Sequence, residues 1–206
     1  MKSPVYVVDY GVGNVGSVVN MIKRAGGEAV ASGDLQLLSS AAKVLLPGVG
    51  SFDNAIQKLR ERGLIEVLQE RAAAGVPFLG ICLGMQLMAS VSEEGKLPGL
   101  GLIPGQVKRF KIDPALQNLK IPHMGWSKIH KIKDSHLLDG LDEKSRFYFV
   151  HSYHYDCADP EDCLLQTEYG YLFTSAIERR NLMGVQFHPE KSHRYGMQLF
   201  KNFVDL

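Results

Sequence analysis

The chain has 206 residues, of which 45% are hydrophobic, and its 23 basic and 22 acidic residues leave a formal charge of +1. A chain of this size can bury a large core, and its even charge balance argues against a nucleic-acid partner. No apolar stretch approaches the roughly 18 residues of a membrane span, and the segment after Met1 lacks the character of a signal peptide. We therefore expect one domain over residues 1–206, located in the cytoplasm and without a membrane partner.

The first half of the chain alternates apolar runs with amphipathic segments. Three of these runs have the length of β-strands: 5–9, 28–32 and 43–46. Asn14 is the expected N-cap of a helix that runs to Ala25, and a second helix is expected to begin near Ser51. Apolar residues recur at helical spacing in that second helix and are expected to face the core: Phe52, Ala55, Ile56 and Leu59.

The segment between the first strand and its helix is rich in glycine. Gly11, Gly13 and Gly16 have the spacing G-x-G-x-x-G of dinucleotide-binding loops. That pattern also needs an acidic residue roughly 20 positions later, and by itself it is a weak signal. A nucleotide-binding alternative therefore stays open.

A cysteine flanked by glycines follows the next apolar run, at 76–79. Cys82 lies between Gly80 and Gly84, at the start of a helix expected over 83–88. Glycines two residues before and after the cysteine permit a strand-to-helix turn too tight for side chains, as in a nucleophile elbow. A thiol at a helix N-terminus is readily deprotonated. The pattern predicts a nucleophile at Cys82, with a buried structural cysteine as the alternative.

The second half of the chain is expected to be rich in β-structure. After a loop over 93–99, short apolar runs between turn residues predict strands over 106–110, 127–132, 146–150, 164–168, 173–178 and 183–187. Hairpin turns are expected at 169–170 and 180–181, and an amphipathic helix with Met197, Phe200 and Val204 on one face is expected over 194–206. These elements predict a three-layer α/β fold, in which a mostly parallel central sheet is flanked by helices and extended by antiparallel strands.

A histidine and a glutamate follow the last predicted strand. Pro189 separates His188 from Glu190 and restricts the histidine to an extended conformation. A thiolate nucleophile needs an imidazole to move its proton, and the imidazole needs a third group to fix its tautomer. Because ligands gather at the carboxyl ends of parallel strands, we expect Cys82, His188 and Glu190 to form a catalytic triad. The alternative is a solvated surface pair of histidine and glutamate.

Residues 80–86 and 188–190 together resemble the class I (triad) glutamine amidotransferases. Members of this family hydrolyse the side-chain amide of glutamine and hand the ammonia to a synthase. The resemblance extends from residue 9 to residue 192. It implies a flavodoxin-like class I glutamine amidotransferase fold and a glutaminase that acts by cysteine nucleophilic catalysis, without a cofactor.

Two further segments narrow the resemblance. Residues 47–52 and 122–126 are similar to the glutaminase subunits of imidazole glycerol phosphate synthases, and Val49 replaces the glycine usual in other members of the class. One departure is Ser127, where this subfamily has asparagine, at a position near the partner surface. The resemblance implies that the partner is a (βα)-barrel cyclase, which forms imidazole glycerol phosphate and aminoimidazole carboxamide ribotide in histidine biosynthesis.

The resemblance also implies roles for individual residues. The backbone N–H groups of Leu83 and of the loop around Val49 are expected to form the oxyanion hole. Glutamine is expected to contact residues of several segments: Gly48, Gly50, Gln86, Glu94, His151, Ser152 and Tyr153. Asn14, Trp126 and Lys191 are expected to form the docking face for the cyclase. For Gln86 and Trp126 the alternatives are a helix-face glutamine and a core tryptophan.

The remaining cysteines and histidines suggest no metal site. Cys157 and Cys163 flank a polar turn and are expected to be reduced and structural. His151 and His154 would face opposite sides of an extended strand. Three alternative functions stay open: a stand-alone γ-glutamyl hydrolase or cysteine peptidase, a non-catalytic module that retains the elbow, and the glutaminase of vitamin B6 synthesis.

Overall fold

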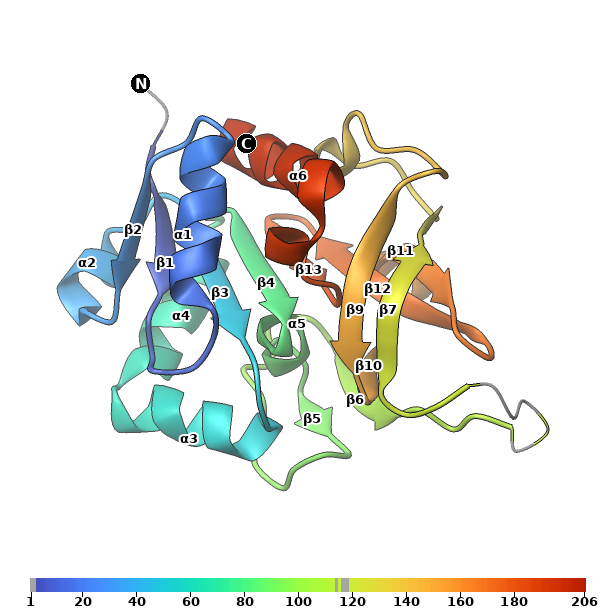
Figure 1. The fold of residues 1–206 in the computed structure, drawn as a ribbon. Helices are drawn as coiled ribbons and strands as arrows, with labels where there is room; N and C mark the ends of the chain where they lie inside the picture. The colour runs from blue at the N-terminus through green and yellow to red at the C-terminus, as the bar shows by residue number, and fades with distance from the viewer. Residues whose placement is uncertain (1–2, 114, 116–118) are drawn as a thin grey trace.

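The computed structural model describes residues 3–113, 115 and 119–206. The expectation that the segment after Met1 lacks the character of a signal peptide therefore lies partly outside the described residues. A central β-sheet separates two layers of helices (Figure 1). This arrangement is the three-layer α/β fold expected from the alternation of apolar and amphipathic segments.

One half of the central sheet is parallel. Its strands are β1 (Val5–Val8), β2 (Ala29–Ser32), β3 (Val44–Gly48), β4 (Phe78–Cys82) and β13 (Leu182–Val185). They lie in the order β2-β1-β3-β4-β13, and each pairs in parallel with its neighbour. With β13 as the fifth strand, this is the order of flavodoxin-like sheets. The expectation of a mostly parallel centre is confirmed.

The other half of the sheet is mainly antiparallel. It contains β5 (Val91–Ser92), β6 (Gly105–Arg109), β8 (His130–Lys131), β10 (Tyr153–Cys157), β11 (Cys163–Glu168) and β12 (Leu172–Arg179). The strands continue from β13 in the order β12-β10-β6-β5, while β11 also pairs with β12 and β8 pairs with β11. A separate antiparallel pair, β7 (His123–Lys128) and β9 (Arg146–His151), covers this half on one face (Figure 1).

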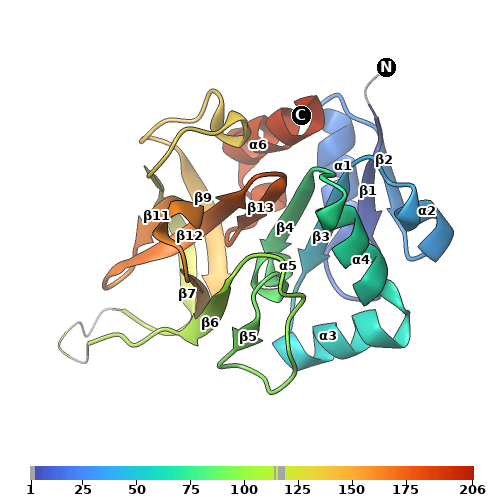
Figure 2. The same ribbon diagram turned by 180° about the vertical axis from the view of Figure 1, so that it is seen from behind.

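Helices cover both faces of the sheet. On the face with the β7–β9 pair lie α1 (Val15–Arg24) and α6 (His193–Asp205). The opposite face carries α2 (Leu35–Ser39), α3 (Phe52–Glu61), α4 (Leu64–Ala73) and α5 (Leu83–Leu87), as seen from behind in Figure 2. Three short 3₁₀ turns complete the described elements: η1 (His136–Leu138), η2 (Pro160–Asp162) and η3 (Pro189–Lys191). None of the described helices is both long and apolar enough to cross a membrane.

Alternating side chains of the parallel strands fill two separate cores. Val5 and Val7 of β1 pack under α1 and α6, whereas Val8 packs on the other face with α3. The predicted core side of α3 is confirmed, since the side chains of Phe52 and Ile56 are fully buried. Strands that are apolar on both faces are typical of a sheet covered on both sides.

The two predicted hairpins are present. The turn after β11 is closed by the Tyr169 N–H, which donates to the Tyr171 carbonyl. At the turn between β12 and β13, Arg180 has a positive φ of 57°. The side-chain amide of Asn181 donates to the carbonyls of Ala72 (2.9 Å) and Val76 (2.8 Å), which connects this turn to the end of α4 and to the loop that leads into β4.

Some elements differ from the sequence-based expectations. The strand expected over 127–132 is wrong, because the chain passes from the β7–β9 pair into the main sheet at the buried Ile129. The last strand ends at Val185, two residues earlier than expected. Asn14 occupies the N-cap position of α1, but its side chain makes no capping hydrogen bond.

Several elements were not predicted, among them α2, α4, β5 and β10. A local signal for α2 exists, since the side chain of Asp34 accepts from the Leu37 N–H. The start of α4 follows Gly63, which takes a left-handed conformation. In β10 the polar side chains His154 and Asp156 break the apolar run on which the strand expectations were based.

The turn from β4 into α5 packs directly against β3. A Cβ atom on Gly84 would lie 1.9 Å from the Leu46 carbonyl oxygen, and one on Gly80 would lie 2.7 Å from the Gly84 carbonyl oxygen. Backbone atoms cannot move aside as a flexible side chain can. The flanking glycines of the cysteine are therefore required by close backbone approach.

Replacing Gly84 tests this packing. Gly84→Ala is expected to lower the free energy of unfolding by about 1–3 kcal/mol, because overpacking forces backbone shifts. The measurement is the midpoint of urea unfolding. In the matched control, Gly16→Ala, the new Cβ would have no heavy atom within 4 Å, so the midpoint is expected to stay or rise slightly. Equal midpoints for Gly84→Ala and the wild type would contradict the packing argument.

Candidate active site

The predicted nucleophile lies on a strained turn. Cys82 ends β4 and directly precedes α5, with φ of 54° and ψ of −112°. Residues with a Cβ rarely adopt positive φ, and those that do concentrate at functional sites, where the surrounding structure holds them. The turn has the form expected of a nucleophile elbow at the carboxyl end of a parallel strand.

The predicted base follows β13, the strand that pairs in parallel with β4. The N–H of His188 donates to the Tyr148 carbonyl at 2.9 Å, and the Ser192 hydroxyl donates to the His188 carbonyl at 2.6 Å. Nδ1 of His188 lies 2.8 Å from Oε1 of Glu190, and the side chains of both residues are only 2% exposed. Because a carboxylate only accepts hydrogen bonds, Nδ1 donates and Nε2 remains for Cys82.

The charge of this histidine is set by its two partners. Burial lowers the pKa of His188, but hydrogen bonds with Cys82 and Glu190 outweigh that effect and raise the pKa to about 10. The ring is therefore protonated at neutral pH, and an adjacent imidazolium stabilises a thiolate. The structure brings Cys82, His188 and Glu190 together as expected from the sequence.

A cavity of about 350 Å³ opens over the cysteine. Most of the predicted site residues line it: Val49, Gly50, Cys82, Leu83, Gln86, Glu94, His151, Ser152, Tyr153, His188 and Lys191. Pro122, which begins the motif at 122–126, and Val150, which no motif marked, also line the cavity. The cavity thus joins segments of the parallel half of the sheet to the β7–β9 pair and β10.

The loop after β3 passes beside the elbow. Gly48 is the register partner of Cys82, and a Cβ on it would lie 2.8 Å from the Gly84 nitrogen. Val49 is 42% exposed, and Gly50 has a φ of 95° that favours glycine. Gly48 does not line the cavity itself, so its place in the site is to let this loop approach the cysteine.

Gln86 connects three parts of the site. Its side-chain amide donates to the Tyr153 carbonyl at 3.0 Å and to Oε1 of Gln186 at 2.9 Å. The amide of Gln186 in turn lies 3.7 Å from the Cys82 sulfur. Sequence reasoning missed Gln186, although a polar residue at the end of the apolar run before His188 was an available signal.

Glu94 reaches the cavity from the loop after β5. Its Oε2 accepts a hydrogen bond from the Phe52 N–H at 2.9 Å, so it caps α3 at a place where the Ser51 side chain does not. Burial raises the pKa of Glu94 despite the opposing effect of that hydrogen bond. A partly buried carboxylate at this wall is suited to bind a cationic group.

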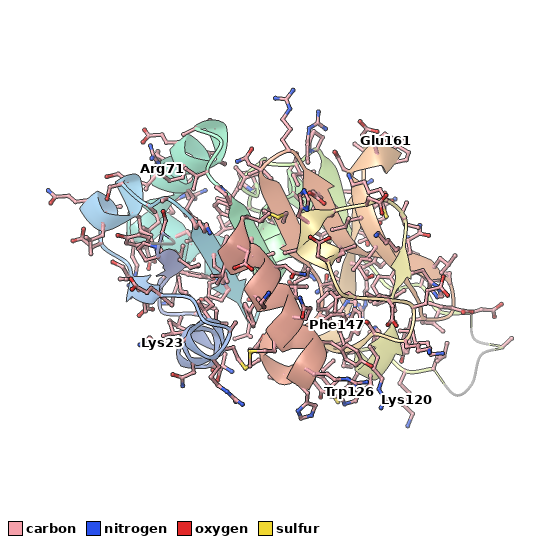
Figure 3. All side chains as sticks on the ribbon, turned by 90° about the horizontal axis from the view of Figure 1, so that it is seen from above. Lys23, Arg71, Lys120, Trp126, Phe147 and Glu161 are labelled. Carbon is pink, nitrogen blue, oxygen red and sulfur yellow. The ribbon has the colours of Figure 1, made fainter. Side chains whose placement is uncertain are left out.

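Two of the three predicted docking residues lie away from the cavity. Asn14 is exposed at the start of α1, and Trp126 is 43% exposed on β7, where its ring stacks on His193. Figure 3 shows Trp126 at the edge of the molecule, with Phe147 of β9 further inside. The third, Lys191, lines the cavity and lies 5.8 Å from the centre of the Tyr148 ring. The segment around Trp126 is the strand β7.

The remaining cysteines lie apart from this cavity. Cys157 and Cys163 are free, and burial raises the pKa of Cys157 to about 12. Within the described residues, no group of three or more histidine, cysteine, aspartate or glutamate side chains could hold a metal ion. The geometry of Cys82, His188 and Glu190 supports the chemistry of a cysteine nucleophile served by an imidazole and a carboxylate.

Comparison with known proteins agrees with this geometry. Residues 6–206 match the family described as glutamine amidotransferase class-I. The chain is 49% identical over 199 residues to "Imidazole glycerol phosphate synthase subunit HisH 2" of Methanococcus maripaludis, covering 96% of this chain and 97% of the relative. It is also 49% identical over 203 residues to the protein of the same name in Pseudomonas aeruginosa, covering 98% and 99%.

Solved structures show the same fold at low sequence identity. A glutamine amidotransferase from Thermotoga maritima has a TM-score of 0.64 at 18% identity, covering 92% of this chain and 77% of that one. The structure of PurLQS from the same organism has a TM-score of 0.75 at 19% identity, covering 100% and 99%. From the match over nearly its whole length, the chain belongs to the class I glutamine amidotransferase family.

Proposed function

We propose that this chain is the glutaminase subunit of an imidazole glycerol phosphate synthase, acting as a single domain over residues 1–206. It hydrolyses glutamine to glutamate and ammonia and delivers the ammonia to a (βα)-barrel cyclase, which forms imidazole glycerol phosphate and aminoimidazole carboxamide ribotide. The observation that carries the proposal is that Cys82 and His188 line one cavity, with the buried Glu190 hydrogen-bonded to the far side of the His188 ring. The names of relatives at 49% identity support the choice of synthase.

The proposed reaction has two stages. The Cys82 thiolate attacks the carbonyl carbon of the glutamine side chain, and a sulfur–carbon bond forms as the carbonyl becomes an oxyanion. The N–H of Leu83 and one from the loop around Val49 stabilise that oxyanion. His188 gives its proton to the departing ammonia, then takes one from the water that releases glutamate.

Substrate binding uses the opposite wall of the cavity. The α-ammonium of glutamine needs an anion, and Glu94 supplies a partly buried carboxylate. Gly50, Gln86, Ser152 and Tyr153 complete the pocket for the amino-acid end. Since both hydrogen bonds recorded for Gln86 use its amide nitrogen, its contact with substrate would use the carbonyl oxygen.

The cyclase is proposed to dock on the outer face of the β7–β9 pair. Trp126 and Met124 expose apolar side chains there, with Met124 at 61% exposure, and Lys191 lies at the adjoining mouth of the cavity. Asn14 extends this face along α1, which contacts η3. Ammonia released into water is protonated and lost as a nucleophile, so docking over the cavity mouth serves the chemistry. Because all three cysteines are free, we place the complex in the reducing cytoplasm.

The first test is glutamate release from glutamine, measured with and without the cyclase and its ligand. Wild-type release is expected to rise when the cyclase is added, and Cys82→Ala is expected to reduce it by at least roughly 10³-fold. Cys157→Ala, at a cysteine outside the cavity, is the matched control and should retain the wild-type rate. Unchanged release by Cys82→Ala would overturn the proposal, and full activity on γ-glutamyl conjugates without the cyclase would favour a stand-alone hydrolase.

A second test addresses the charge of the histidine. Glu190→Gln removes the carboxylate that helps to hold the proton, so the pKa of His188 is expected to fall from about 10. The measurement is an NMR titration of the imidazole resonances, with kcat/KM expected to fall roughly 10²–10⁴-fold. Glu178→Gln, outside the cavity, serves as control. A pKa unchanged by Glu190→Gln would show that the pair does not set the charge of the ring.

A third test concerns the docking face. Trp126→Ala is expected to weaken binding of the cyclase by roughly 30-fold, because a large aromatic anchor is lost from the interface. Isothermal titration calorimetry gives the dissociation constant. Leu37→Ala, an equally exposed apolar residue on α2 (46% against 43%), should bind like the wild type. If the two variants bind equally well, Trp126 is not part of the interface.

A further inference from the structure

Two buried histidines outside the catalytic group form a continuous hydrogen-bonded chain. Nδ1 of His123 lies 3.1 Å from Nε2 of His151, and its Nε2 lies 2.9 Å from the Ser127 hydroxyl. At the other end, Nδ1 of His151 lies 2.8 Å from the carbonyl oxygen of Tyr153. The chain thus runs from β7 through β9 to the start of β10.

The direction of each hydrogen bond in this series follows from the Tyr153 carbonyl at its end. A carbonyl only accepts, so Nδ1 of His151 carries a hydrogen and donates to Tyr153. In a neutral ring the other nitrogen then accepts, which requires His123 to donate from its Nδ1. By the same reasoning Nε2 of His123 accepts, and the Ser127 hydroxyl donates to it. With both rings neutral, His123 and His151 are therefore in the same Nδ1–H form.

The surroundings favour neutral rings. Burial lowers the pKa of His123 to about 4 and the pKa of His151 well below its ordinary value. His123 stacks on Tyr169 and Phe149, with ring centres 4.0 Å and 4.8 Å away, so it has aromatic faces rather than an anion beside it. The positive charge on nearby His188 further disfavours a charge on His151. These hydrogen bonds among Ser127, His123, His151 and Tyr153 are suited to fix the local backbone geometry, and they are not suited to carry a proton near neutral pH.

The end of the chain is a wall of the active-site cavity. The Tyr153 carbonyl accepts from His151 on one side and from the Gln86 amide, on α5, on the other. The preceding carbonyl, that of Ser152, accepts from the Phe110 N–H at 3.0 Å. Two successive carbonyls are thus fixed in a segment that lines the cavity.

We propose that Ser127, His123 and His151 are positioning residues for the glutamine substrate, acting as a one-directional hydrogen-bond relay that fixes the Tyr153 carbonyl and with it the shape of the substrate-binding segment. The inference rests on the proposed glutaminase function. None of the three donates to the reacting amide; their effect passes through the backbone of residues 152–153. Loss of the relay therefore acts on substrate binding before it acts on the chemical step.

The kinetic test uses pairs of variants in the complex with the cyclase. His151→Leu removes the donor to Tyr153 and is expected to raise KM for glutamine roughly tenfold, with kcat within about threefold of wild type. His151→Asn places an amide nitrogen where Nδ1 lies and is expected to restore KM to within about threefold of wild type. Ser127→Val and Ser127→Thr form a second pair of similar volume, in which only threonine keeps the hydroxyl.

The spectroscopic test determines the tautomers of the two histidines and does not require enzyme activity. Nitrogen-15 shifts of the imidazoles are expected to show His123 and His151 neutral and in the Nδ1–H form at neutral pH, with the His123 signals changed by Ser127→Val and kept by Ser127→Thr. An Nε2–H form or a charged ring in the wild type would overturn the relay. An unchanged KM in folded His151→Leu and Ser127→Val would overturn its positioning role. Wild-type protein with no Cys82-dependent hydrolysis would instead refute the proposed function and leave the tautomers measurable.

Discussion

The structure depends on the parallel pairing of β4 with β3 on one side and β13 on the other. This pairing places Gly48 beside Cys82 and aligns Val185 with Ile81, so the segment carrying His188 leaves the sheet at the same edge as the cysteine. The tight contact of Gly84 with the Leu46 carbonyl fixes how α5 begins. Cys82, the segment carrying His188 and the loop after β3 therefore come from three adjacent strand ends, and their spacing is that of the hydrogen-bonded ladder rather than of flexible loops.

The antiparallel half of the sheet and the β7–β9 pair have a different part in the site. They supply part of the cavity lining, including His151, Ser152 and Tyr153. Gln86 bridges the two halves, because it lies on the helix after the cysteine and donates to the carbonyl of Tyr153. Buried polar groups of this kind are costly unless every member is bonded, which explains why the histidines of this wall form a continuous chain rather than isolated contacts.

The parallel half and the grouping of Cys82, His188 and Glu190 were predictable because their signals are local. The strand-to-helix turn is indicated by Gly80, Cys82 and Gly84. Only one proline separates His188 from Glu190 in the sequence. What the sequence did not indicate depends on contacts between distant segments. The hydrogen bond between Gln86 and Gln186 joins residues that are 100 positions apart. The division of residues 127–132 between two sheets depends on the pairing of β7 with β9. β10 was missed because its polar side chains find buried partners, as His154 does with Tyr171.

One consequence follows from the hairpin that joins β12 to β13, at the opposite end of the strand from His188. Asn181 anchors this corner to the backbone at Ala72 and Val76. A slip of β13 by a single position would displace its far end by about 3.3 Å and turn its side chains to the opposite face. The position of the His188 imidazole relative to the Cys82 sulfur therefore depends on a turn remote from both residues. There the side chain of Asn181 holds β13 in register.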